Sequence, residues 1–316
     1  MEIKVVTAQV FEEYMEQYCD LYELCFRQTM KPEEVRWRYL ENPQKELFAC
    51  FAIEAGKLIA SYSASPVEVR ICGKIRKAIL SLNTMTHPDY SGRGLFIRLA
   101  EQVYQLAGKK GYQFVFGFPN HISNRTFVSK LGWRDIYEIP TMERVVDEKL
   151  LSKMPCDFSA VEEDSGFMFD YRSCFPQEKE RVCVNKSNEY LKWRYADNPV
   201  NRYRTFVIKN GEQQVCSYVV CKEYKERLNI IDYFMADAAQ TELLFGWCIS
   251  LAEQLEKTLI TAWAKLGEKE HLHLEKLGFK NNYPITYLGA RAFGDLQMEL
   301  YNYQNWTANM GDDNVY

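Results

Sequence analysis

Two glycines separated by one residue stand between an apolar stretch and an amphipathic stretch, within THPDYSGRGLF at residues 86–96. Ala78–Thr86 is apolar and β-prone, and apolar residues then recur at helical spacing up to Lys109: Leu95, Phe96, Leu99, Val103 and Leu106. Glycines let the backbone turn tightly and approach a ligand, and the first amides of a helix point outward with the positive end of its dipole. The pattern therefore predicts strand, glycine loop and helix, with a site suited to a pyrophosphate to which Arg93 adds charge.

Other phosphate signatures are absent from this stretch. No Gly-Lys-Ser/Thr follows, so it is not a Walker loop, and Gly-x-Gly-x-x-Gly is missing, so it is not a dinucleotide fingerprint. Without further context, a tight turn between strand and helix explains the glycines equally well.

Composition narrows the class of protein. The 316 residues favour two domains, and 47% hydrophobic with 26% charged residues is typical of a folded chain. A net charge of −4 argues against a nucleic-acid partner, although Arg70, Lys74, Arg76 and Lys77 form a local basic run that is either a patch or a solvated strand edge. Ten cysteines without a Cys-x-x-Cys pair and an N-terminus without a signal-peptide pattern favour the cytoplasm. We expect no membrane span and, from four histidines without zinc spacing, no metal site.

An internal repeat organises the chain. RWRYLENP at 36–43 returns as KWRYADNP at 192–199, and FVSKLGWRD at 127–135 returns as HLEKLGFKN at 273–281. After each Asn-Pro the sequence predicts a hairpin, with its turn at Gly56-Lys57 in the first copy and at Asn210-Gly211 in the second. A helix is expected before each copy, begun near Lys31-Pro32 and near Ser187-Asn188. We expect two related domains, 1–148 and 149–316.

The first copy carries a family resemblance. Residues 86–133 resemble the acyl-CoA-binding core of the GNAT superfamily of N-acetyltransferases, whose signature is Gln/Arg-x-x-Gly-x-Gly/Ala between a strand and a helix. Its six positions fall here on Ser91, Gly92, Arg93, Gly94, Leu95 and Phe96, of which Gly94 matches the strict pattern. The resemblance implies an α/β (α+β) fold, with two tandem GNAT-like domains, each a mixed, largely antiparallel sheet flanked by helices.

It also implies site residues. In the family, two parallel strands splay so that pantetheine lies between them, which assigns the backbone near Met85 and Thr86 to the cofactor. Asn120 matches the polar residue that ends the second strand, and Leu131-Gly132-Trp133 matches Leu-Gly-Phe. Acetyl-CoA is then the acyl donor.

The second copy lacks the glycines. Its corresponding loop contains Ala236 to Gln240, and Asp237 would repel a phosphate. We therefore expect one cofactor site, in the first domain, and a scaffold or cleft-wall role for the second. The WRY stretch, present in both copies, follows the fold rather than the cofactor.

The catalytic residues that the resemblance implies are matched only in part. Family members use a carboxylate as base and a tyrosine as acid, but the tyrosine position holds Phe127 or Val128 in this chain. Candidate bases are Glu68, on the segment before the core strand, and His121, beyond the second strand; either could be an ordinary surface residue.

The sequence is compatible with three functions. The first is an acyltransferase that moves acetyl from acetyl-CoA to a primary amine of a small molecule, an amino sugar or amino-acid derivative, by direct attack in a ternary complex. The others are a tRNA-dependent aminoacyl transferase of the peptidoglycan-bridge type and a non-catalytic acyl-CoA-binding module. The oligomeric state is open. The polar tail at 302–316 predicts disorder, with the alternative that Trp306 packs on a domain while Asp312 and Asp313 line an amine-binding cleft.

Overall fold

The computed structural model describes residues 1–146, 157–174, 181–313 and 316. The chain folds into two compact units. Unit 1 contains Met1–Tyr137, Lys179–Val182 and Tyr287–Asn305, and unit 2 contains Glu138–Glu178, Cys183–Thr286 and Trp306–Tyr316.

The elements up to the end of the first repeat follow the order expected from the sequence. They are β1 (Glu2–Val5), α1 (Ala8–Glu13), α2 (Met15–Phe26), α3 (Pro32–Tyr39), β2 (Phe48–Glu54), β3 (Lys57–Ile71), β4 (Lys74–Thr86), the 3₁₀ turn η1 (Pro88–Tyr90), α4 (Leu95–Lys109), β5 (Phe114–Gly117), α5 (His121–Leu131) and β6 (Arg134–Val145). The expected strand, glycine loop and helix are confirmed.

From the WRY stretch to its last strand, the second repeat follows the same order of elements as the first. The elements after β6 are β7 (Glu162–Glu163), β8 (Val182–Val184), α7 (Asn188–Leu191), the π-helical turn η2 (Lys192–Ala196), β9 (Arg204–Lys209), β10 (Val215–Tyr224), β11 (Arg227–Phe234), α8 (Ala238–Gln254), β12 (Leu259–Trp263), α9 (Lys269–Lys276), β13 (Lys280–Ala292), α10 (Gln297–Leu300), η3 (Tyr303–Asn305) and η4 (Met310–Asp312). Both predicted hairpins, β2–β3 and β9–β10, are present.

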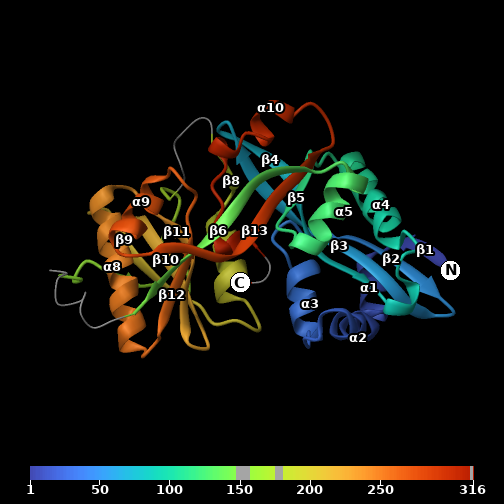
Figure 1. The fold of residues 1–316 in the computed structure, drawn as a ribbon, viewed down its shortest axis with the longest axis horizontal. Helices are drawn as coiled ribbons and strands as arrows, with labels where there is room; N and C mark the ends of the chain where they lie inside the picture. Colours follow the sequence, from blue (N-terminus) through green and yellow to red (C-terminus); the bar gives the residue numbers. More distant parts are fainter. Residues whose placement is uncertain (147–156, 175–180, 314–315) are drawn as a thin grey trace. The chain divides into compact units, whose positions relative to one another are not determined.

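Each unit has a mixed, largely antiparallel sheet, which confirms the predicted fold class. The strand order is β1-β2-β3-β4-β5-β13 in unit 1 and β6-β12-β11-β10-β9-β7 in unit 2. Each unit contains a parallel strand pair, β4 with β5 and β11 with β12. In unit 1, α4 and α5 pack on one face of the sheet and α1 to α3 on the other (Figure 1).

The last strand of each sheet comes from the other repeat. Gly289–Ala292 of β13 pairs antiparallel with Phe114–Gly117 in unit 1, and Thr141–Val145 of β6 pairs antiparallel with Leu259–Trp263 in unit 2. The units therefore differ from two successive halves of the chain. The boundary expected between residues 148 and 149 lies outside the described residues.

The repeated WRY stretch ends a helix in both units, as its spacing predicted. Arg38 is buried and donates to Glu34 at 2.7 Å, whereas Arg194 is buried and donates to the carbonyls of Gly311 and Asp313. These contacts support the architectural interpretation of the repeat.

Candidate active site

The parallel strands β4 and β5 of unit 1 pair over only part of their length. β4 pairs with β5 only from Ala78–Leu80 to Phe114–Phe116, but it continues against β3 as far as Thr86. Among the described residues, β5 thus does not pair with β4 beyond Leu80, and backbone groups near the end of β4 face a gap between the two strands.

Hydrogen bonding decides which residues of β4 face this gap. The amide of His87 donates to the carbonyl of Ile59 on β3 at 2.8 Å. Backbone groups alternate in direction along a strand, so Thr86 points away from β3 and Met85 points toward it. Of the two expected residues, Thr86 therefore offers its amide to the gap, while Met85 is a buried core residue.

The glycine loop leaves the N-terminus of α4 open. Gly92 and Gly94 have φ angles of 75° and 68°, in the left-handed region that side chains disfavour. Gly94 is the N-cap of α4, and no side chain caps the helix. Ser91, Gly92, Arg93 and Gly94 are exposed, and an added Cβ at either glycine would have no heavy atom within 4 Å among the described residues. The first amides of α4 are therefore accessible to an anion.

The other two signature positions, Leu95 and Phe96, pack the first turn of α4 against the core of unit 1. Leu95 is 2% exposed, and Phe96 is half-buried and stacks on the ring of Tyr62 at 6.2 Å. Their side chains pack into the core, so only their backbone can serve a ligand.

Tyr90 holds the loop against the sheet. Its hydroxyl donates to Glu54 of β2 at 2.7 Å, which lowers the pKa of Glu54 and raises that of Tyr90. The Arg93 guanidinium lies 4.6 Å from the centre of the Tyr90 ring and donates to the carbonyl of Asp89. Arg93 is thus placed at the loop by local contacts.

A buried chain of polar groups lies where β4 and β5 separate, and sequence reasoning missed it. Tyr62 donates to Ser81, directly after the last strand pair, at 2.8 Å, and its hydroxyl lies 3.0 Å from that of Tyr104, which accepts from the Trp133 indole. Burial raises the pKa of Tyr62 and Tyr104, which keeps both hydroxyls protonated. Inward alternation along β3 marks Tyr62 as buried, but nothing in the sequence links it to Ser81.

The residues after β5 turn the chain into α5. Asn120 is the N-cap, and its Oδ1 accepts from the amides of Ile122 and Ser123 at 3.1 and 2.9 Å. His121 is the first helical residue and is exposed. Phe127 is buried against Trp133, and Val128 is 38% exposed, so neither tyrosine position supplies a hydroxyl.

Glu68 lies away from the open end of the strands. It pairs with Lys77, three residues before Leu80, which is about 10 Å along the strand from the point of separation. Burial raises the pKa of Tyr112, which follows α4, and the charges of Glu46 and Glu68 add to this effect. The structure does not bring Glu68 to the glycine loop.

In unit 2 the corresponding strands also separate, but the helix end is closed. β11 pairs with β12 up to Ile230 and continues to Phe234. Asp237 caps α8, and its carboxylate accepts from the amide of Gln240 at 2.8 Å and from the Gln240 side chain at 3.0 Å. A carboxylate of the chain itself thus occupies this helix N-terminus.

The C-terminal segment fills the polar interior of unit 2. Lys186 forms ion pairs with Asp232 at 2.7 Å and with Asp312 at 3.1 Å, and Asn309 donates to Asp232 and to the carbonyl of Tyr233. Burial opposes the charge of Lys186, but the two carboxylates outweigh it and raise its pKa. The expectation of a disordered tail is wrong for residues 302–313: Trp306 is 2% exposed and Asp312 contacts an internal amine.

The described residues were compared with the patterns of a metal site and of a membrane-spanning helix. They include no group of three or more histidine, cysteine, aspartate or glutamate side chains that could hold a metal ion. None of their helices is long and apolar enough to cross a membrane.

Comparisons with known proteins agree with this geometry. Residues 7–136 match the family model described as acetyltransferase (GNAT) domain. A GCN5-related N-acetyltransferase from Anabaena variabilis has a TM-score of 0.70 at 13% identity, covering 92% of this chain and 72% of its own. A tandem GNAT protein from the clavulanic acid biosynthesis pathway has 0.63 at 13% identity, covering 93% and 99%. N-myristoyltransferase of Saccharomyces cerevisiae, solved with myristoyl-CoA, has 0.61 at 13% identity, covering 92% and 79%. No curated protein matches in sequence.

The matched region contains the separated strands, the glycine loop and α4, and the similar structures extend over both units. Acyltransferases of this family take their acyl group from acetyl-CoA or another acyl-CoA. Residues 7–136 thus match a GNAT acetyltransferase domain, and the similar structures show that both units share the fold of tandem GNAT proteins.

Proposed function

We propose that this protein is an acetyl-CoA-dependent N-acetyltransferase, and that unit 1 alone binds the cofactor. The observation that carries the proposal is the uncapped N-terminus of α4, with Gly92 and Gly94 in left-handed conformations beside the gap between β4 and β5. The pyrophosphate accepts from the first amides of α4, and a pantetheine amide group pairs with the backbone of Thr86.

The acceptor in this proposal is a primary amine of a small molecule, such as an amino sugar or an amino-acid derivative. Its nitrogen attacks the thioester carbonyl directly in a ternary complex, and the thiolate of CoA leaves and takes up a proton. Because Phe127 and Val128 cannot donate one, catalysis depends on positioning and on polarisation of the carbonyl by backbone donors. The attacking amine gives its proton to water, because neither candidate base, His121 nor Glu68, lies in position for direct contact.

Two measurements test this function. Calorimetry of the full chain with acetyl-CoA should give one site per chain. A panel of amines, followed by release of the CoA thiol, should identify acceptors, and an acetyl group should leave acetyl-CoA only when an amine is present. Absence of acetyl-CoA binding would contradict the proposal, and a stable acetylated protein would contradict direct attack.

A second candidate is a module that binds acyl-CoA without turnover. The side chains at the two tyrosine positions, Phe127 and Val128, favour this function because neither can donate a proton to the leaving thiolate. Acetyl-CoA binding without thiol release across the amine panel would select this function over the enzyme.

A further inference from the structure

A cavity of about 440 Å³ lies in unit 1 at the other end of α4 from the glycine loop. Helix α4 has fifteen residues, so the two ends are about 22 Å apart. The cavity lies between the start of β4, the turn into β5 and the segment after β13, and its main side chains are Arg76, Tyr112, Gln113, Phe293, Asp295 and Leu296. This volume is within the range of small-molecule sites.

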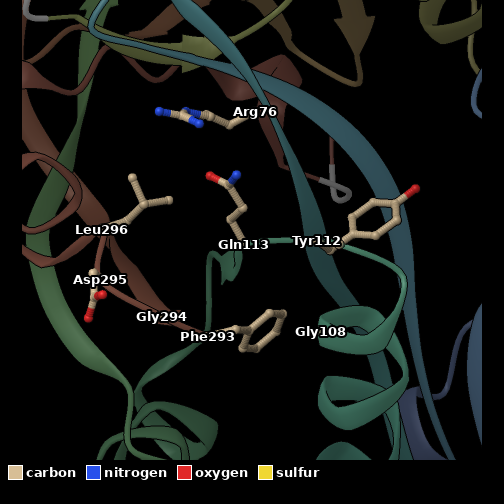
Figure 2. Close-up of a pocket in the computed structure, with 9 residues that line it drawn as sticks. Arg76, Gly108, Tyr112, Gln113, Phe293, Gly294, Asp295 and Leu296 are labelled. Carbon is tan, nitrogen blue, oxygen red and sulfur yellow. The ribbon is translucent and has the colours of Figure 1, made fainter.

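Two polar side chains face this cavity with unused hydrogen-bonding capacity. Figure 2 shows the Arg76 guanidinium and the Gln113 amide extending over the same hollow, with Leu296 opposite. Among the described residues, Nε of Arg76 and Oε1 of Gln113 are buried without a hydrogen-bond partner. The backbone of Gln113 is engaged on both sides, with Lys77 and Phe293. Because buried polar groups are normally paired, the Arg76 donor and the Gln113 acceptor are suited to hydrogen bonds with a ligand.

The charges around the cavity favour a ligand that carries one carboxylate and one ammonium group. Within the basic run noted in the sequence, Lys77 is paired with Glu46, which also binds Lys110. Arg76 is the residue of that run that lines the cavity, and its planar fork matches a carboxylate. Asp295 stands at the rim and is exposed, which disfavours a doubly charged phosphate and favours an ammonium group.

We propose that this cavity binds an apolar α-amino acid, at a site separate from the cofactor site. The carboxylate of the ligand accepts from Arg76, and its ammonium group donates to Oε1 of Gln113. Its side chain packs on Phe293 and Leu296. The site needs no acyl-CoA, so its occupancy is independent of the proposed function.

The test uses L-phenylalanine with the full chain, measured by calorimetry without acetyl-CoA. We expect saturable binding, weakened about tenfold or more for 3-phenylpropanoate, which lacks the amine, and for 2-phenylethylamine, which lacks the carboxylate. Arg76→Met should weaken L-phenylalanine binding at least about tenfold, and Gln113→Leu should do so independently. Lys74→Met removes the same charge from the same hairpin without touching the cavity and should bind as wild type does.

Three results would overturn the assignment. They are no binding of L-phenylalanine, binding that survives both Arg76→Met and Gln113→Leu in folded protein, and inorganic phosphate displacing the amino acid. The Gly94→Asp variant separates the two proposals, because it should lose acetyl-CoA and keep L-phenylalanine.

Discussion

Helices α4 and α8 follow corresponding strands of the two repeats, β4 and β11, yet their N-termini differ. The first begins at Gly94, in a left-handed conformation and without a side-chain cap, whereas the second begins at Asp237, whose carboxylate binds the amide of Gln240. Both ends carry the same partial positive charge, because that charge comes from the backbone. In unit 2 the chain supplies the anion at this position, whereas in unit 1 no side chain of the described residues caps the helix.

The interior of unit 2 also contains a cation that is paired with carboxylates of the chain itself. The ammonium group of Lys186 lies between Asp232 and Asp312, beside the end of β11 that β12 no longer pairs. The carboxamide of Asn309 donates to the backbone of β11 at Tyr233, as an amide of a bound ligand would. In unit 2, residues of the chain itself thus supply the charges and hydrogen bonds at this end of the strands.

The largest effect is expected from removing the internal cation. Lys186→Met leaves two buried carboxylates without their partner, which should cost about 3–5 kcal/mol in the free energy of unfolding measured with urea. Asp312→Asn in the same background should restore part of the loss. A cost below about 1 kcal/mol would show that unit 2 does not depend on its internal charges.

The pH dependence of this variant has a definite sign. Burial raises the pKa of Asp312, and Asp232 adds to the effect while Lys186 opposes it. Without Lys186 the folded state binds protons more tightly than the unfolded state. The stability of Lys186→Met relative to wild type should therefore rise as pH falls from 7 to 5.

The second prediction closes the open helix of unit 1. Gly94→Asp places a carboxylate at the N-terminus of α4, as in unit 2, and should weaken acetyl-CoA binding about 100-fold, or about 2.7 kcal/mol. Gly94→Asn has the same shape, tolerates the left-handed conformation and carries no charge, so it should weaken binding by less than about tenfold. Equal losses in the two variants would show that backbone strain, and not the anion site, is responsible.

The third prediction opens the closed helix of unit 2. Asp237→Ala should lower stability by about 1 kcal/mol, the usual cost of a lost N-cap, as measured by urea unfolding. The acetyl-CoA stoichiometry measured by calorimetry should stay at one, because no glycine loop is present there. A second cofactor site in this variant would break the comparison between the units.

The sequence predicted this contrast well because it depends on local signals. Glycine or aspartate at a helix N-terminus, Asn before Pro and hairpin turns act over a few residues, and each was in the expected place. The exchanged strands β6 and β13 could not be predicted, because the two repeats carry similar strands and either sheet can pair with either one. The Tyr62–Ser81 contact and the tail around Lys186 could not be predicted for another reason: each joins residues on different elements of the chain.

The smallest effect is expected at the two side chains first considered as bases. Glu68 is about 10 Å along the strand from the point where β4 and β5 separate, and His121 is exposed beyond the end of β5. Neither position allows direct contact with an amine attacking at that point, so Glu68→Gln and His121→Gln should each lower kcat/KM less than about threefold. The pH profile of kcat/KM should keep its wild-type shape, since the acceptor amine loses its proton to water. Loss of one limb of that profile in either variant would make that residue the base, and catalysis would then depend on a side chain rather than on positioning and backbone polarisation alone.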